Sequence, residues 1–465
     1  MTDPIESLAR PQTGPLLPLL PPKPLTRSLP PLPVRSPLPQ LLPGWTCETF
    51  TVPAAFPRSY PNSTKHASEP LHDPTDAKGG RLDPQKAWDE LIKPQVDGFN
   101  NPVKLDDKEE LERQEQLVLA VNRYRPPKEN RRKGLTLVLS HANGFYKEVW
   151  EPMLSHLLKD LEASNCLPVE EIWALDCVLQ GDSATLNEDV LDSVFNWVDH
   201  GRDIVNFLIS YIDANPSSSD SSPLPALQPA ADIDPTLLKL DNVPSIAPGP
   251  ASPAQRKYRD RLIVGIGHSL GGGGTAFAAT ACPSLFSSVI FLDPVLVAPH
   301  HPARSTRPLA GGALVRRQKW KSKEEALEGF QKKAFFKAWD EEILKGYCEF
   351  GLRDTEDGGV ALKTTARNEA LTFADASVVA SIRANTRLAS LPKSLPVHWV
   401  WADEGRSVLP EFNIQQLVQE RVPHSTMSRV KGAGHLIVHE NPKATATCIG
   451  EFLKKTYPAK SLSKL

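Results

Sequence analysis

The stretch "LIVGIGHSLGGGGT", residues 262–275, decides the expected fold of this 465-residue chain. An apolar run stops at Ser269, glycines stand two residues before and two residues after that serine, and three more glycines follow. Gly267-His268-Ser269-Leu270-Gly271 matches G-x-S-x-G, a strained turn between a strand and a helix that exposes a serine hydroxyl. The apolar "LIVGIG" before the motif predicts the strand, and "GTAFAATA" after it predicts the helix.

Two other glycine-rich loops do not fit these residues. A phosphate-binding loop needs a lysine followed by serine or threonine at the end of the glycine run, and none stands there. A dinucleotide-binding fingerprint spaces its glycines as G-x-G-x-x-G, whereas residues 271–274 are contiguous. A nucleophile elbow is therefore the expected structure, with Gly267, His268 and Gly271 as its supporting residues.

The rest of the chain alternates predicted strands with predicted helices. Strands are expected within 47–56, 115–126, 134–145, 169–183, 289–297 and 395–408, and amphipathic spacing predicts a helix over 194–212. Buried runs such as "GLTLVLS" are typical of strands covered on both faces. We predict an α/β fold with a mostly parallel central sheet, helices on both faces, and a helical lid inserted before the penultimate strand.

The expected domain organisation follows the composition. We expect a Pro-rich, disordered N-terminus over 1–46, a core over 47–299 and 391–458, a helical lid over 300–390 and a tail over 459–465. Insertions at 61–112 and 214–257 are expected to be largely disordered. Aromatic residues of the lid are either lining of a substrate pocket or ordinary lid core: Trp320, Phe330, Phe335, Phe336 and Trp339.

A serine hydroxyl needs a base to remove its proton, and in this kind of fold the order along the chain is serine, acid, histidine. His435 lies in the glycine-rich loop "GAGHLIVHENP" and is preferred to the neighbouring His424 and His439. The acid is either Asp293, at the end of "VIFLDPV", or Asp403, in the turn "WADEGRSV". Asp293 is preferred, because Asp403 is out of register with the usual G-x-x-D turn.

The oxyanion of an acyl-transfer reaction needs two backbone N–H donors. We expect one from Leu270, directly after the serine. We expect the other from Asn143, in the loop "His141-Ala142-Asn143-Gly144-Phe145" after the apolar run.

Charge and hydropathy argue against two functional classes of protein, nucleic-acid-binding and membrane-spanning proteins. A net charge of −2 gives no sign of nucleic-acid binding, and no apolar run is long enough to span a bilayer. The C-terminal Ser463-Lys464-Leu465 spells SKL, the signal read by the peroxisomal import receptor. We therefore expect a peroxisomal protein that has this receptor as a partner.

Several segments together resemble one family. They are "FTVPAAFPRSYP", "LAVNRYRPP", "SHANGFYKEVWEPML", "FNWVDHGRDI", "GHSLGG", "LFSSVIFLDPVL", "GLRDTEDGGVALKTTARNEALTF" and "GAGHLIVHENP". They resemble the α/β-hydrolase superfamily, in particular the fungal branch that contains the peroxisomal lipase and the hydrolases of host-selective toxin biosynthesis. The resemblance implies a Ser-His-acid hydrolase of a small acyl ester or lipid, without metal or organic cofactor, and it favours Asp293 as the acid.

Two alternatives stay open at this point. The same residues suit an acyltransferase or a thioesterase of fatty-acid or secondary metabolism, because the chemistry of the nucleophile is shared. A third hypothesis is a ligand-binding protein on the same scaffold. The presence of both Ser269 and His435 argues against it.

Overall fold

The computed structural model describes residues 16–32, 40–69, 83–213, 226–228, 240, 261–297, 306–375 and 378–459. Within these residues, eight strands form the main sheet in the order β1-β2-β4-β3-β5-β6-β10-β11. They are β1 (Thr46–Pro53), β2 (Val118–Arg125), β3 (Leu135–Ser140), β4 (Val169–Leu175), β5 (Leu262–His268), β6 (Ser288–Leu292), β10 (Val397–Trp401) and β11 (Thr426–Arg429). From β4 to β11 the neighbouring strands run parallel, while β2 is antiparallel to both β1 and β4.

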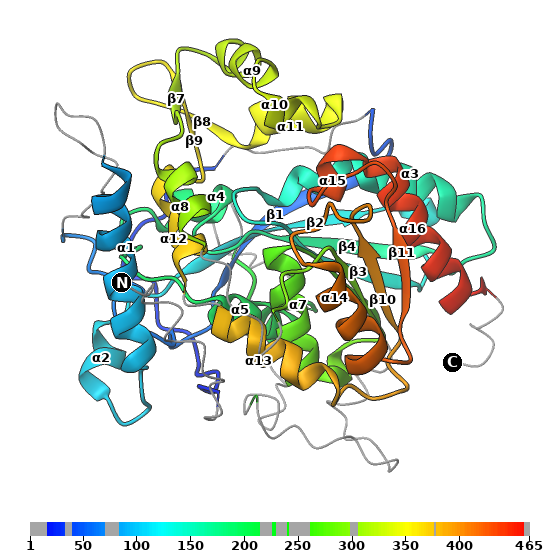
Figure 1. Cartoon of the computed structure of the whole chain (residues 1–465), viewed down its shortest axis with the longest axis horizontal. Helices are drawn as coiled ribbons and strands as arrows, with labels where there is room; N and C mark the ends of the chain where they lie inside the picture. Colours follow the sequence, from blue (N-terminus) through cyan, green and yellow to red (C-terminus); the bar gives the residue numbers. More distant parts are fainter. Residues whose placement is uncertain are drawn as a thin grey trace.

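Helices cover both faces of this sheet (Figure 1). The helices α5 (Trp197–Ser210), α7 (Leu270–Ala281) and α13 (Val378–Leu388) pack together on one face. The helices α3 (Glu151–Glu162) and α16 (Pro442–Thr456) pack together on the other. Two large apolar cores result, one beneath each helical layer. The expected α/β fold with a mostly parallel sheet is confirmed.

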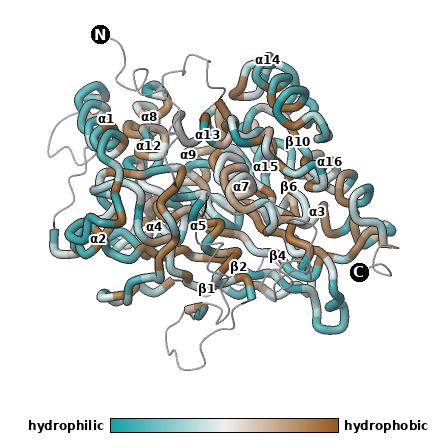
Figure 2. Tube along the Cα trace, turned by 90° about the horizontal axis from the view of Figure 1, so that it is seen from below, coloured by the Kyte–Doolittle hydropathy of each residue, from teal (hydrophilic) through white to brown (hydrophobic). Residues whose placement is uncertain are grey.

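Shorter elements complete the body of the molecule. They are α2 (Lys108–Arg113), α4 (Gly181–Asn187), α14 (Glu411–Gln415), the following π-helix (Gln416–Arg421), α15 (Ile437–Glu440), and 3-10 turns at Lys128–Asn130, Lys147–Trp150 and Pro283–Leu285. Figure 2 shows hydrophilic residues gathered on peripheral elements such as α2. No helix among the described residues is both long and apolar enough to cross a membrane.

The lid lies between β6 and β10, where the sequence predicts it. It contains α8 (Arg307–Leu314), α9 (Lys323–Gln331), α10 (Ala334–Lys337), α11 (Glu341–Phe350), α12 (Ala366–Ala374) and α13. The sequence did not predict its small antiparallel sheet, in the order β7-β9-β8, made of β7 (Lys319–Trp320), β8 (Leu352–Asp354) and β9 (Val360–Leu362). These strands are two or three residues long, too short for an alternating pattern to show.

The prediction of disorder over 61–112 is wrong for much of that segment. Residues Pro84–Asn100 form α1, which begins at the N-cap Asp83 and packs against the lid helices α8 and α12. Trp88, Leu91 and Ile92 are buried on one side of it. A proline inside the helix and several charged residues interrupt the apolar pattern in the sequence, so the helix was not predicted.

The prediction of a disordered N-terminus is also wrong for 16–32. Leu16 and Leu19 are buried in the main core. The Arg202 guanidinium donates to the carbonyls of Leu17 at 3.1 Å and Pro18 at 3.0 Å. An extended Pro-rich chain leaves its carbonyls unpaired, so cationic side chains of the body can bind it.

Two other expectations concern segments that the structure describes only in part. Of the insertion 214–257, residues 226–228 and 240 are described, and Leu227 and Leu240 are buried. The C-terminal residues Ser463, Lys464 and Leu465 lie outside the described residues.

Candidate active site

Ser269 stands at the turn between β5 and α7, as the sequence predicts. Its backbone has φ 54° and ψ −111°, a conformation that side-chain-bearing residues rarely adopt. The turn is tight: a Cβ at Gly267 would lie 2.2 Å from the carbonyl oxygen of Gly271, and a Cβ at Gly271 would lie 2.0 Å from that of Ser140. Only glycine fits at either position, and the result is a serine side chain held at the carboxyl edge of the sheet.

The glycines that follow are explained by close packing of α7. A Cβ at Gly272 would lie 2.6 Å from the Cβ of Pro294, and one at Gly274 would lie 2.6 Å from Cδ2 of His200. Glycine is costly in a helix, by about 1 kcal/mol relative to alanine. Here that cost is offset because the helix can approach α5 and the segment after β6 closely.

His435 and Asp293 lie in line with Ser269. The Nε2 atom of His435 is 2.8 Å from Ser269 Oγ, and its Nδ1 atom is 2.5 Å from Asp293 Oδ2. Asp293 follows the last residue of β6 and is fully buried, and its other oxygen accepts a hydrogen bond from the Ala402 N–H at 3.1 Å. The three side chains come from segments 24 to 166 residues apart in the chain and form one hydrogen-bonded row.

Asp293 has the electrostatics of an ionised partner. Burial by itself would raise the pKa of its carboxyl group, but the hydrogen bond and charge of His435 and the Ala402 N–H together bring the pKa below its ordinary value. A carboxylate in this state fixes the orientation of the imidazole and stabilises a proton on it.

Asp403, the alternative acid, lies in a different setting. Its carboxylate accepts hydrogen bonds from the N–H of Gly432 at 2.8 Å and of Glu404 at 3.0 Å. These bonds lower the pKa of Asp403 and close the loop that precedes His435. The structure therefore brings Asp293, and not Asp403, to the imidazole.

Asn143 and Leu270 are available as backbone donors. Neither of their N–H groups makes a hydrogen bond to another described residue. The Gly271 N–H donates to the His141 carbonyl at 3.1 Å, which joins the loop after β3 to the start of α7. Both predicted donors thus lie on segments that meet beside Ser269.

The residue that holds the Asn143 loop is not among those predicted from the sequence. Gln180, at the N-terminus of α4, donates from Nε2 to Asn143 Oδ1 at 2.5 Å and accepts from the Gly144 N–H at 3.2 Å. The same Nε2 donates to Thr372 of the lid helix α12 at 3.2 Å. Its place shortly after the carboxyl end of β4 was the available signal, since ligand-binding residues gather at that edge of an α/β sheet.

His268 was predicted only as part of the elbow, but its side chain has a further contact. It is 1% exposed, and its Nε2 lies 3.0 Å from the main-chain oxygen of His435. Burial lowers the pKa of His268 to about 3, so the ring is neutral and carries its proton on the nitrogen that faces this carbonyl. His268 thus links the serine turn directly to the histidine loop.

His439 lies beside this group but is not joined to Ser269. It is fully buried, and its ring packs 4.0 Å from the ring of Phe145 and 4.9 Å from that of Trp339, measured between centroids. Burial holds its pKa well below the ordinary value. It is a neutral member of the apolar core, in agreement with the preference for His435.

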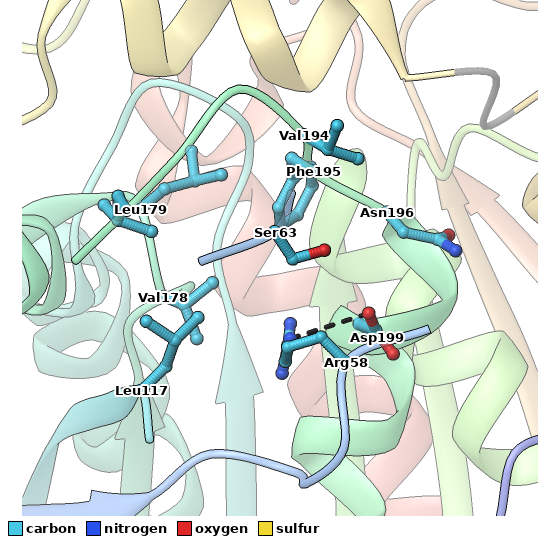
Figure 3. Close-up of a pocket in the computed structure, with 10 residues that line it drawn as sticks. Arg58, Ser63, Leu117, Val178, Leu179, Val194, Phe195, Asn196 and Asp199 are labelled. Atoms are coloured by element: carbon cyan, nitrogen blue, oxygen red, sulfur yellow. Dashed lines mark ion pairs between the residues drawn. The ribbon is translucent and has the colours of Figure 1, made fainter. Parts of the chain in front are cut away.

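A small pocket of the protein is shown in Figure 3. Its polar lining includes Arg58 and Asp199, which form an ion pair at 3.5 Å. Arg58 also pairs with Asp203 at 2.7 Å, and Asp199 with Arg202 at 2.6 Å. Because these charges neutralise one another, we assign the pocket to the framework of the protein. None of its lining residues belongs to the predicted site.

The model of the alpha/beta hydrolase family matches residues 137–447, more than half of the chain. This chain belongs to the alpha/beta hydrolase family. The matched region of this α/β-hydrolase includes Ser269, Asp293, His435 and both predicted N–H donors.

Curated relatives lie within the expected branch. The hydrolase is 24% identical over 243 residues to the type I acyl-CoA thioesterase mpaH of Penicillium roqueforti, covering 51% of this chain and 45% of the relative. It is 29% identical over 167 residues to the peroxisomal membrane protein LPX1 of Saccharomyces cerevisiae, covering 35% and 31%. It is 24% identical to the abhydrolase domain-containing protein AKT2 of Alternaria alternata, covering 42% and 83%. The chain thus spans less than half of the length of the thioesterase and of LPX1.

The solved structures agree on the fold. The peroxisomal alpha-beta-hydrolase Lpx1 of Saccharomyces cerevisiae superposes with a TM-score of 0.59 at 19% identity, covering 89% of this chain and 90% of that one. At this identity the likeness shows the fold alone.

Proposed function

We propose that this protein is a serine hydrolase that cleaves acyl substrates through Ser269, His435 and Asp293. The observation that carries the proposal is the continuous row from Ser269 Oγ to His435 Nε2 at 2.8 Å and from His435 Nδ1 to Asp293 Oδ2 at 2.5 Å. A hydroxyl next to an imidazole whose far nitrogen is hydrogen-bonded to a buried carboxylate is the arrangement that activates serine as a nucleophile.

The proposed reaction has two halves. Ser269 Oγ attacks the acyl carbonyl while His435 Nε2 takes the hydroxyl proton, and Asp293 stabilises the imidazolium. The N–H groups of Leu270 and Asn143 hold the negative oxygen of the tetrahedral intermediate. His435 then gives its proton to the leaving group, and a water molecule deprotonated by the same imidazole releases the acid and restores Ser269.

The substrate class is proposed as an acyl ester, a lipid or an acyl thioester. The resemblance to the fungal branch favours an ester or lipid, and the matches to proteins named acyl-CoA thioesterase favour a thioester. An acyltransferase would use the same residues but pass the acyl group to an alcohol or amine. The row of side chains is common to all of them, since it acts on the carbonyl carbon.

A substrate panel tests the proposal. The purified protein is assayed with p-nitrophenyl esters, glycerides and acyl-CoA thioesters of increasing chain length, with and without an added alcohol. We expect turnover of at least one class, and Ser269→Ala should lower kcat by about 10⁶-fold or to background. Transfer to the alcohol in preference to water would assign an acyltransferase. Turnover that persists in Ser269→Ala would exclude the proposed nucleophile, and no turnover of any class would favour a ligand-binding protein.

We also propose a peroxisomal location. It rests on the C-terminal Ser463, Lys464 and Leu465 and on the similarity to LPX1, which is named a peroxisomal membrane protein. A fluorescent protein fused to the N-terminus leaves the signal free. The fusion should colocalise with a peroxisomal marker, and deletion of 463–465 should abolish this. Colocalisation with the marker that persists after this deletion would contradict the proposal.

A further inference from the structure

The outermost part of the lid carries an exposed aromatic ring between lysines. We define the lid tip as residues 331–339, "QKKAFFKAW", which surround the short helix α10. Phe335 is 58% exposed, unlike most large apolar side chains of the protein, which are buried. Lys332, Lys333 and Lys337 are also exposed.

The three lysines are not neutralised by the residues that the structure describes. None of them forms an ion pair with a described residue, although other lysines of the lid do. Lys323 pairs with Glu349 at 2.7 Å, and Lys345 pairs with Glu341 at 2.8 Å. The lid tip therefore presents three unpaired positive charges within six residues, around one exposed apolar ring.

The lid tip is in ring-to-ring contact with the candidate active site. The ring of Phe335 lies edge-on to that of Trp339, 5.5 Å away, and Trp339 lies edge-on to Phe145, also 5.5 Å away. Phe145 belongs to the loop that carries the proposed donor Asn143. A surface bound at the lid tip would thus lie two ring contacts from the loop that holds the oxyanion.

The shape of this region favours an extended partner. In Figure 1, α9, α10 and α11 project with the small lid sheet from the top of the molecule, away from the main sheet. A projecting tip cannot enclose a small soluble anion, but it can enter a flat surface. Lysines bind the anionic headgroups of such a surface, and an aromatic side chain enters the boundary between headgroups and acyl chains.

We propose that the lid tip docks on a membrane surface that contains anionic lipid. Phe335 enters the interface, and Lys332, Lys333 and Lys337 lie at the level of the headgroups. The proposal does not depend on the identity of the catalytic residues, because it concerns binding and not turnover.

Vesicle sedimentation tests this binding. The full chain is mixed with vesicles of phosphatidylcholine alone, or of phosphatidylcholine with 30% phosphatidylglycerol, at about 0.1 M salt. We expect binding to the anionic vesicles and release as the salt is raised, because the charges become screened. A lysine near an anionic surface is worth about 1 kcal/mol, or about fivefold in binding, so K332Q/K333Q/K337Q should bind about 100-fold more weakly.

A matched control distinguishes binding through the lid tip from nonspecific binding through any exposed aromatic side chain. Phe412 on α14 is 66% exposed, and its neighbours in the sequence are Glu411 and Asn413. Phe335→Ser should weaken vesicle binding several-fold, while Phe412→Ser should leave it unchanged. All variants should keep the thermal midpoint, since the changed side chains are exposed. The triple lysine variant and Phe412→Ser should also keep the turnover of a short soluble ester, because their residues lie outside the proposed triad.

Three results would overturn the proposal. The first is wild-type protein that does not sediment with anionic vesicles. The second is a triple lysine variant, folded by circular dichroism, that binds as the wild type does. The third is wild-type binding that equimolar free CoA abolishes, because the lysines would then serve a soluble phosphate-bearing ligand.

Discussion

Replacement of Asp293 by asparagine is the substitution that most sharply separates the proposed acid from its alternative. The carboxylate is fully buried and lies 2.5 Å from His435 Nδ1. Asparagine keeps the size of the side chain and an oxygen for the Ala402 N–H, so the fold should persist. It removes the negative charge and offers an amide that can turn an N–H toward the ring, which favours the wrong tautomer of His435.

The size of the effect follows from the loss of that charge. A carboxylate and an imidazolium with charge centres about 4 Å apart attract each other by about 4 kcal/mol at an effective dielectric constant near 20. This stabilisation exists only once His435 has taken the proton, so its loss raises the barrier and spares substrate binding. We expect kcat to fall by about 10³-fold with KM nearly unchanged.

The assay is steady-state hydrolysis of whichever ester or thioester the panel identifies, with Asp403→Asn as the matched control. Asp403 holds backbone N–H groups of the neighbouring loop, so its replacement should change kcat by no more than about twofold. Circular dichroism and the thermal midpoint show that both variants are folded. If Asp403→Asn loses the larger factor and Asp293→Asn keeps most of its activity, the reasoning from the structure is refuted.

Three further predictions test how the site is held. His268→Phe removes the hydrogen bond to the His435 carbonyl and should lower kcat about tenfold at unchanged KM, with partial rescue by His268→Gln; equal kcat in all three proteins would argue against this role. Gly274→Val should lower the free energy of unfolding in urea by about 1–3 kcal/mol because its Cβ would contact His200, whereas Gly311→Ala, with open space around it, should not; equal effects would contradict the packing argument. The pKa values of His200 and His268 are lowered to about 3 by burial, so the unfolded chain takes up protons below about pH 6.5 that the folded chain does not. The free energy of unfolding therefore decreases as the pH is lowered. Between pH 7.5 and 5.5 urea unfolding should show a loss of about 3 kcal/mol from these two groups, and unchanged stability would show that they are protonated when folded.

The sequence predicts the centre of the fold well because local pattern and tertiary environment agree there. The run before Ser269 is apolar on both faces of its strand. The glycines around Ser269 allow the backbones of the strand and the helix to approach each other closely. Asp293, at the end of a predicted strand, was preferred because Asp403 is out of register with the usual G-x-x-D turn, and the hydrogen bond to His435 agrees with that preference.

Elsewhere the sequence could not supply what the structure shows. The N-terminal residues Leu17 and Pro18 accept hydrogen bonds from Arg202, which lies 185 residues away from Leu17, and no local pattern encodes that contact. Likewise, α1 is stabilised through its contacts with the lid helices α8 and α12. The role of Gln180 depends on a loop 36 residues earlier, and the contact of His268 depends on a carbonyl 167 residues later.

The central claim is that Ser269 is an activated nucleophile, and covalent labelling tests it most directly. The purified protein is treated with a fluorophosphonate probe, digested and analysed by mass spectrometry. We predict one modified peptide carrying the adduct on Ser269, no adduct in Ser269→Ala, and strongly slowed labelling in His435→Ala. Absence of labelling in the folded wild-type protein, or an adduct on another serine that persists in Ser269→Ala, would contradict the account.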